Sequence, residues 1–139
     1  MKKVFVFAML LMASFTIQAQ TEEELIAATL IDYMEGTANG QAERITKAFH
    51  PDLNLYAVKD GGLLKRPGKE YIQFFTDGKK RDRIGTILMI DYENDAAIAK
   101  VEIANSINAS SYIDYMMLLK VDGKWTIIHK IYTKKVATN

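Results

Sequence analysis

The sequence predicts an α+β fold in which three N-terminal helices pack on one face of a curved, mostly antiparallel sheet. Apolar residues recur at helical spacing through much of the first half of the chain. From Arg83 onward, strand-like runs alternate with short turns that contain Asp, Asn or Gly. Helices followed by consecutive antiparallel strands are typical of α+β domains. The hydrophobic content of 49% is enough for one buried core.

The N-terminus predicts an exported protein. Lys2 and Lys3 precede an apolar stretch, residues 4–17, and the small residue Ala19 follows. This order is typical of a signal peptide, and the stretch falls short of the roughly 20 residues of a membrane span. We therefore expect a signal peptide over 1–19 and a single domain over 20–139, located in the periplasm or secreted, with no membrane attachment after cleavage. A buried N-terminal helix is the alternative.

The helical elements can be placed from their capping residues. Thr21 and Glu24 form a capping box that opens a helix ending near Gly36. Asn39 could cap a second, short helix, which the dipeptide His50-Pro51 ends. Pro67 suits the first position of a third helix. Its apolar face would consist of Tyr71, Ile72, Phe74 and Phe75.

Three hairpins supply the predicted strands. The first hairpin joins residues 53–58 and 63–66 through the turn KDGG. The second joins residues 84–92 and 96–104 through a turn at 93–96. The third joins residues 110–120 and 124–135 through VDG. Both faces of the run 113–121 are mostly apolar, whereas a sheet covered on one side should alternate. A second subunit would cover the other face. We therefore expect a homodimer through the sheet face that carries Trp125 and Ile127.

Composition narrows the chemistry. Outside the predicted signal peptide the chain has one more acidic than basic residue, which argues against nucleic-acid binding. It has no cysteine, which excludes disulfides and thiol catalysis, and only two histidines, His50 and His129. No metal-ligand spacing, P-loop or serine-nucleophile motif is present, so we expect neither a metal site nor a cofactor.

Asp114 lies within the apolar run 113–119 and needs a partner, because an unpaired buried carboxylate costs several kcal/mol. A two-residue turn at Asp122-Gly123 would place Asp114 opposite Ile131 and leave it unpaired. A three-residue loop would place it opposite Lys130, with Tyr112 opposite Tyr132, and a slip of one residue exchanges the two faces. Satisfaction of the buried carboxylate favours the three-residue loop. The pair would be structural, would orient a ligand, or would take part in acid–base chemistry.

The chain resembles the NTF2-like superfamily, which includes SnoaL-type cyclases and ketosteroid isomerases. The likeness rests on YMEGTANGQAERITKAFHPDLNLYAV, DGGLLKRPGKEYIQFF and DYMMLLKVDGKWTIIHKIY, and is greatest to small bacterial proteins grouped as putative lumazine-binding. The resemblance implies a cone-shaped fold. It also places the isomerase oxyanion donors on Tyr33 and Asp114 and the general base near Ala57, which cannot accept a proton. Isomerase activity is therefore not expected.

These observations predict an exported protein that binds a small molecule without turning it over. One alternative is an enzyme of SnoaL or ketosteroid isomerase type acting on an enolisable or polycyclic substrate, and another is an interaction module with a filled cone. Arg66 could reach an anion at the pocket mouth or simply be solvated. The aromatic candidates form either a pocket or ordinary core. We expect the ligand-binding residues to be Tyr33, Tyr56, Phe74, Tyr112, Asp114, Lys130 and Tyr132.

Overall fold

The computed structural model describes residues 19–105, 107 and 110–135, so the predicted signal peptide lies outside the described residues except for Ala19. The fold is α+β, as predicted. The elements follow one another as α1 (Glu22–Asn39), α2 (Ala42–Ala48), β1 (Phe49–Lys59), β2 (Gly62–Pro67), α3 (Gly68–Gln73), β3 (Ile84–Glu93), β4 (Ala96–Ala104), β5 (Ser111–Val121) and β6 (Lys124–Lys134).

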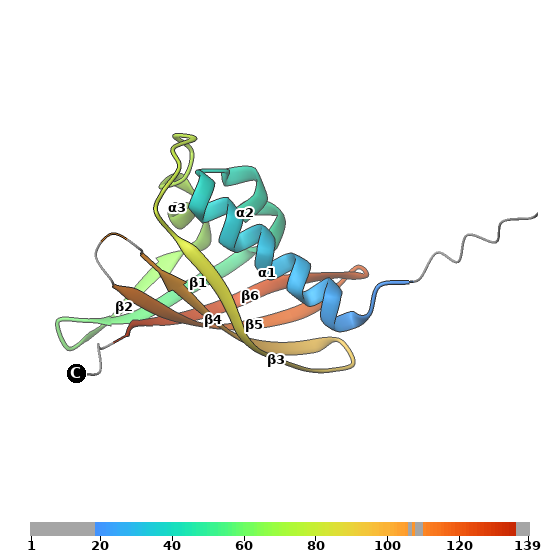
Figure 1. Cartoon of the computed structure of the whole chain (residues 1–139). Coiled ribbons are helices and arrows are strands. Elements are labelled where there is room, and N and C mark those ends of the chain that lie inside the picture. The colour runs from blue at the N-terminus through green and yellow to red at the C-terminus, as the bar shows by residue number, and fades with distance from the viewer. Residues whose placement is uncertain (1–18, 106, 108–109, 136–139) are drawn as a thin grey trace, which may run out of the picture.

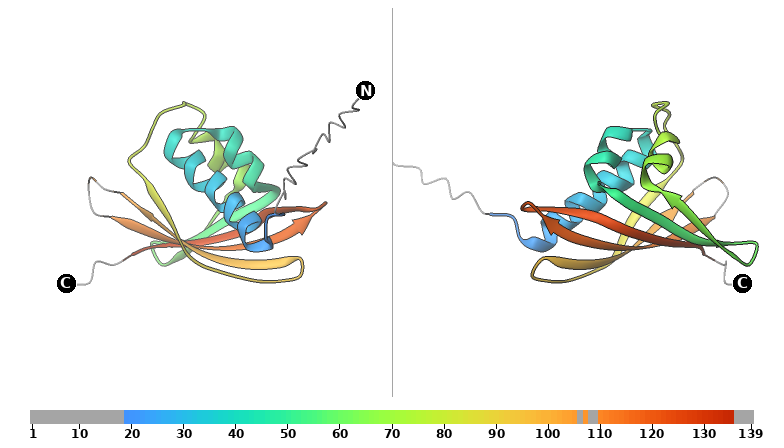
Figure 2. Two further views of the ribbon diagram at one scale, coloured as in Figure 1. Left: turned by 45° about the vertical axis from the view of Figure 1, so that its right-hand side comes forward. Right: turned by 180° about the vertical axis from the view of Figure 1, so that it is seen from behind.

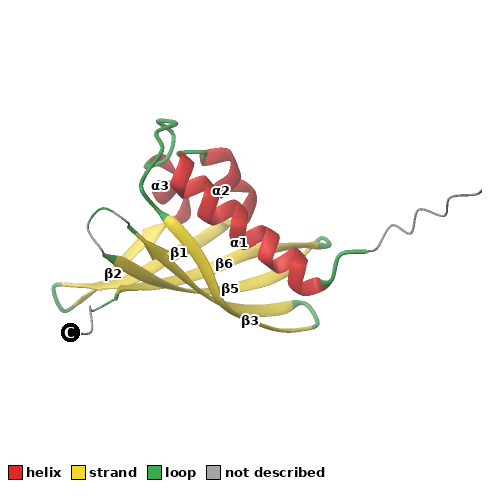
Figure 3. Cartoon of the chain, viewed as in Figure 1, coloured by secondary structure: helices red, strands yellow, loops and turns green. Residues whose placement is uncertain are grey.

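The described strands form one sheet of six in the order β2-β1-β6-β5-β4-β3. All neighbouring strands are antiparallel except β1 and β6, which are parallel. The three helices lie on the same side of this twisted sheet, with α1 crossing it diagonally (Figures 1 and 2). Figure 3 shows that the segment after α3 rises on the helix side before it enters β3. The third helix follows the first hairpin, as predicted from Pro67, so two helices precede the first strand and the third precedes β3.

The first helix begins at the predicted capping box but ends later than predicted. The Glu24 backbone N–H donates to Thr21 Oγ1, and the Glu24 carboxylate accepts from the Thr21 N–H. The helix continues past Gly36 to Asn39 and stops at Gly40, whose φ of 62° is left-handed. Gly36 is a packing residue, because a Cβ there would lie 2.7 Å from Ile45 Cγ1. A close helix–helix approach therefore explains a glycine that looked like a terminator.

The register of the last hairpin differs from the predicted one. Asp122 and Gly123 both have positive φ, and Val121 pairs with Lys124, so the turn has two residues. A bulge between Met117 and Leu118 then shifts the pairing by one residue. Asp114 consequently pairs with Tyr132 and not with Lys130. The predicted three-residue loop is wrong, because the extra residue lies in strand β6 and not in the turn.

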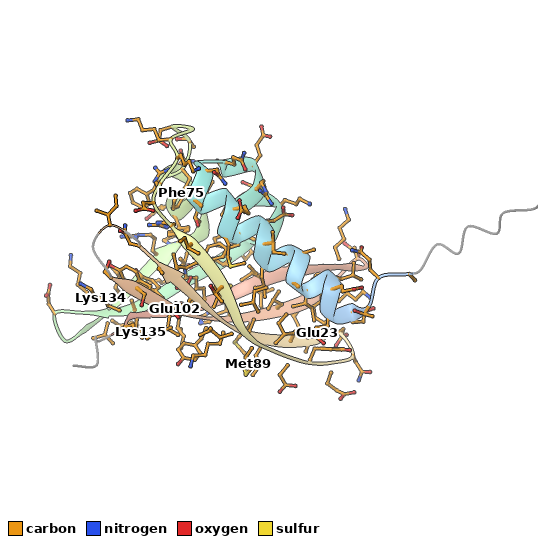
Figure 4. The ribbon with its side chains drawn as sticks, in the orientation of Figure 1. Glu23, Phe75, Met89, Glu102, Lys134 and Lys135 are labelled. Carbon is orange, nitrogen blue, oxygen red and sulfur yellow. The ribbon has the colours of Figure 1, made fainter. Side chains whose placement is uncertain are left out.

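The two-residue turn also makes the predicted dimer face wrong, because it pairs Trp125 with Lys120 and Ile127 with Leu118. Trp125 and Ile127 point to the helix side and are buried in the core, with 5% and 0% exposure. The outer face instead carries residues such as Met117 and Ile131, which are 50% and 47% exposed. Figure 4 shows Met89 on this outer side and Phe75 on the helix side. Any partner on the sheet must therefore contact a different set of residues from the predicted one.

Candidate functional site

Three buried polar side chains from three elements meet beneath the helices. Lys130 Nζ lies 2.8 Å from Asp114 Oδ2, so the predicted ion pair is present. Tyr33 donates its hydroxyl proton to the same carboxylate oxygen at 2.7 Å. Lys130 also donates to Tyr33 Oη. All three residues are at most 3% exposed. Their polar groups therefore form their hydrogen bonds within the protein rather than with bulk water.

The fold brings the three residues together in spite of the changed register. Tyr33 is on the buried stripe of α1 that faces the sheet. Asp114 and Lys130 are on β5 and β6, where Lys130 pairs with Met116 and therefore lies on the same face as Asp114, two pairs along the ladder. Side chains at such diagonal positions are still within reach of a long residue such as lysine. The ion pair thus forms diagonally, where a directly opposed pair was predicted.

Aromatic rings enclose the Lys130 ammonium. Its Nζ lies 4.7 Å, 5.1 Å and 5.2 Å from the ring centroids of Tyr33, Tyr71 and Tyr132. Attraction to ring faces partly offsets the loss of hydration that a buried cation suffers. The Tyr33 and Tyr71 hydroxyl oxygens are 3.4 Å apart. Because the Tyr33 proton goes to Asp114, Tyr71 is the donor in that contact.

Tyr33 remains a neutral phenol throughout the ordinary pH range. Burial raises the pKa of Tyr33 well above its usual value of 10, and the negative charge of Asp114 raises it further. Its single proton is already donated to Asp114, which is paired with Lys130. An isomerase-type oxyanion hole needs a tyrosine proton and a protonated carboxylic acid directed at the substrate. Neither donor is available in that form in this arrangement.

The three residues border a cavity of about 210 Å³. This volume is below the usual range for drug-sized ligands and suits a smaller molecule. Five of the seven predicted site residues are in its lining: Tyr33, Tyr112, Asp114, Lys130 and Tyr132. The other lining residues are Arg66, for which the sequence left open a pocket mouth or a solvated position, and Tyr71, Arg83 and Ile103, which it did not single out for the site. The sequence signal that could have identified Tyr71 as a site residue is its predicted position on the apolar face of α3.

Two predicted site residues lie elsewhere. Tyr56 is on the outer face of the sheet, where its ring is 5.0 Å from that of His129. Phe74 follows the end of α3 and is 56% exposed, while Phe75 beside it is buried. The helix ends at Gln73, two residues before the end of the predicted apolar face, and of the two phenylalanines only Phe75 reaches the core. Ala57 also lies outside the cavity lining.

Other kinds of site find no support in the described part of the chain. Its Asp, Glu and His residues form no group of three that could hold a metal ion. Over the same ranges, no helix has the length and apolar content needed to cross a membrane.

The chain is similar to known proteins both in sequence and in structure. A curated relative, the aldolase FrzH of Cladobotryum sp, is 28% identical over 113 residues, which cover 81% of this chain and 90% of FrzH. An NTF2-like protein of unknown function from Shewanella baltica has a similar structure, with a TM-score of 0.75 and 26% identity over 86% of this chain and 100% of its own. A further NTF2-like protein of unknown function, from Methylobacillus flagellatus, has a TM-score of 0.72 and 27% identity over 86% of this chain and 98% of its own.

A family model covers nearly all of the described domain. The model described as "Putative lumazine-binding" matches residues 21–133, which include every strand except the last residue of β6 and all the residues that line the cavity. With its α+β fold and its NTF2-like structural neighbours, the chain belongs to the putative lumazine-binding family of the NTF2-like superfamily.

Proposed function

We propose that this protein binds one small molecule in the cavity between α1, α3 and the sheet. The observation that carries the proposal is a cavity whose buried end is formed by a satisfied Tyr33–Asp114–Lys130 network. Such a network is rigid, because every member is fixed by the others, and it presents a defined polar surface to a ligand. An open cavity of this kind favours ligand binding over the alternative of an interaction module with a filled cone.

The same network supports binding without turnover. An enolising enzyme needs a base that is free to take a proton from the substrate. Asp114, the carboxylate in the cavity lining, already accepts from both Lys130 and Tyr33. The position that would supply an isomerase base is Ala57. The residues of the cavity therefore suit recognition better than proton transfer.

Lumazine is the first probe to test, since the family description names it. We expect it to bind the purified domain in a fluorescence titration. Tyr112→Ala removes a half-exposed ring from the cavity lining and should weaken binding roughly three- to tenfold, the effect of one lost aromatic contact. Tyr92→Ala is the matched control, because Tyr92 is equally exposed but lies outside this cavity. Tyr92→Ala should leave the affinity unchanged.

Native mass spectrometry of protein from its own host would identify a natural ligand. A retained small molecule that disappears in the Tyr112→Ala variant would support the proposal. Protein that carries no molecule and does not bind lumazine or small aromatic fragments would refute it.

A second candidate function is an aldol-type enzyme, favoured by the relative named as an aldolase and by a buried lysine at the cavity. Carbon–carbon bond formation of this type passes through an enolate or enamine. Incubation with a simple ketone in deuterated water would reveal exchange at the α-carbon. Exchange that Lys130→Met abolishes while the variant stays folded by Trp125 fluorescence would favour the enzyme, and absence of exchange in the wild-type protein would favour a binding protein.

We also propose that the protein is exported and dimeric. The basic, apolar and small residues at positions 2–19 support export. For the dimer, the support is an apolar outer sheet face, which is unusual unless another surface covers it. Its large apolar side chains are 37% to 50% exposed and comprise Met89, Ile98, Tyr115, Met117, Leu119 and Ile131.

A further inference from the structure

The arginines of this chain fall into two classes. Arg44 is 3.0 Å from Asp32, and Arg81 is 3.1 Å from Asp77, so both are neutralised by carboxylates away from the cavity. Arg66 and Arg83 are in the cavity lining. Within the described residues, neither of these two guanidinium groups forms an ion pair with a carboxylate. The arginines without a carboxylate partner in the described structure are therefore the two at the cavity.

These two arginines come from opposite edges of the sheet. Arg66 is on β2, the strand at one edge, and Arg83 directly precedes β3, the strand at the other. They line the same cavity because the twisted sheet and the segment after α3 bring both edges to it. Two cations that approach each other without an intervening carboxylate repel, so their convergence costs free energy that a bound anion would recover.

Aromatic rings hold both guanidinium groups in place. Arg66 Cζ lies 5.1 Å from the centroid of Phe74, and Arg83 Cζ lies 5.4 Å from that of Phe75. A guanidinium stacked on a ring uses its flat face and keeps its in-plane N–H donors for other partners. This also gives a role to Phe74, which is exposed and outside the cavity lining.

The charge balance of the cavity favours an anion. Its lining contains three cations and one carboxylate, and Asp114 is fully engaged by Lys130. Two positive charges remain, at the wall and not at the buried end. Guanidinium groups bind carboxylates through paired, charge-assisted hydrogen bonds, and the tyrosines of the lining offer faces for a flat ring.

We propose that the ligand is a small aromatic carboxylate, held at its carboxylate by Arg66 and Arg83 and at its ring by the tyrosines. This inference rests on the proposed binding function and specifies its ligand class.

Benzoate and its neutral analogue benzamide are the probes, titrated into the domain by isothermal calorimetry. Benzoate should bind at least about tenfold more tightly than benzamide, the usual effect of a charge-assisted hydrogen bond. Arg66→Gln and Arg83→Gln should each weaken benzoate binding about tenfold and leave benzamide binding unchanged. Lys65→Gln is the control, because it removes the same charge from the exposed neighbour of Arg66 and should change neither affinity by more than about twofold. Arg66→Lys and Arg83→Lys serve as replacements for any glutamine variant that fails to fold.

The outcomes separate this inference from the proposed function. Benzamide binding as tightly as benzoate, with no effect of the arginine variants, would overturn the anionic ligand and leave small-molecule binding intact. Equal loss of benzoate binding in Lys65→Gln and in the arginine variants would overturn it too, because the effect would then be general charge. Failure of wild-type protein to bind benzoate at millimolar concentration, while lumazine binds, would refute the carboxylate class alone.

Discussion

The Asp114–Lys130 ion pair makes the most demanding prediction about this fold. The two side chains are 2% and 4% exposed, and the carboxylate accepts from both Lys130 and Tyr33. Asp114→Ala leaves the ammonium buried among aromatic rings without a counter-charge. Lys130→Met leaves the carboxylate buried with the Tyr33 hydroxyl as its remaining donor. Each single change therefore isolates a charge in the core.

The magnitude follows from this burial. Removing one partner of a buried ion pair costs about 3–5 kcal/mol, because the other charge stays in a medium that solvates it poorly. The double change removes both charges. It leaves only the Tyr33 hydroxyl in need of a hydrogen-bond partner, and the Tyr71 hydroxyl, 3.4 Å away, can replace Asp114 in that role. We expect the double variant to lose about 1–3 kcal/mol, the cost of one imperfectly paired polar group. The coupling is then at least about 3 kcal/mol, at or above the upper end of what such cycles usually measure.

Urea unfolding followed by fluorescence is the assay, since Trp125 is the single tryptophan and is buried. A domain of this size has roughly 5–15 kcal/mol of stability, so the single variants should stay measurable. The Lys135–Glu102 pair, with side chains 52% and 23% exposed, is the matched control and should show much weaker coupling. Additive single effects at Asp114 and Lys130 would refute the reasoning, because they would mean that the two charges do not depend on each other.

Three further predictions concern packing, assembly and acid stability. Gly85→Ala should destabilise the domain by about 1–3 kcal/mol, because the new Cβ would lie 2.7 Å from Met34 Cβ and press α1 off the sheet. Met117→Glu, on the apolar outer face, should convert the proposed dimer to monomer in sedimentation. Hydrogen bonds from Lys120 and then Trp125 lower the pKa of Glu22 below its usual 4.5. The stability that Glu22 contributes is therefore complete above pH 4.5 and lost as the pH falls through its folded-state pKa, which should be visible in Trp125 fluorescence.

Each of these predictions has a matched control. Gly62→Ala meets no atom closer than 3.6 Å and should change the stability by less than about 0.5 kcal/mol, so equal effects would discount the α1 contact. Ile107→Glu places the same charge on an apolar residue that is 83% exposed and should leave the assembly unchanged. Glu22→Gln should remove the acid-dependent fluorescence change, and its persistence would assign that change to another carboxylate with a lowered pKa, such as Asp32.

Local sequence signals predicted the elements well, because each depends on neighbours along the chain. The capping box at Thr21 opens α1, and turn residues separate the strands at almost the predicted positions. The errors arose where a remote contact overrides the local signal. Gly36 continues a helix because Ile45 packs against it. Phe74 is exposed because α3 ends one residue before it.

Much of the candidate site was also predictable. A carboxylate in an apolar strand requires a partner, and this requirement pointed to Lys130 through a three-residue loop that the structure does not contain. The resemblance added Tyr33. Arg83 and Ile103 could not be found in this way, because nothing near them in sequence distinguishes a solvated arginine from one that lines a cavity.

The sequence by itself thus determined the fold class, the order of elements and the identity of the buried charge pair, since these follow from periodicity, capping and the cost of burying a charge. Only the tertiary structure decided which face of the sheet each side chain occupies and which residues meet at the cavity. The two-residue turn placed Trp125 and Ile127 in the core, and the bulge beside Met117 then brought Lys130 to the same face, because one extra residue exchanges the two faces of a strand. Arg66 and Arg83 lie at opposite edges of the sheet. They line one cavity because the six-stranded sheet is twisted, which the local sequence around either arginine does not reveal.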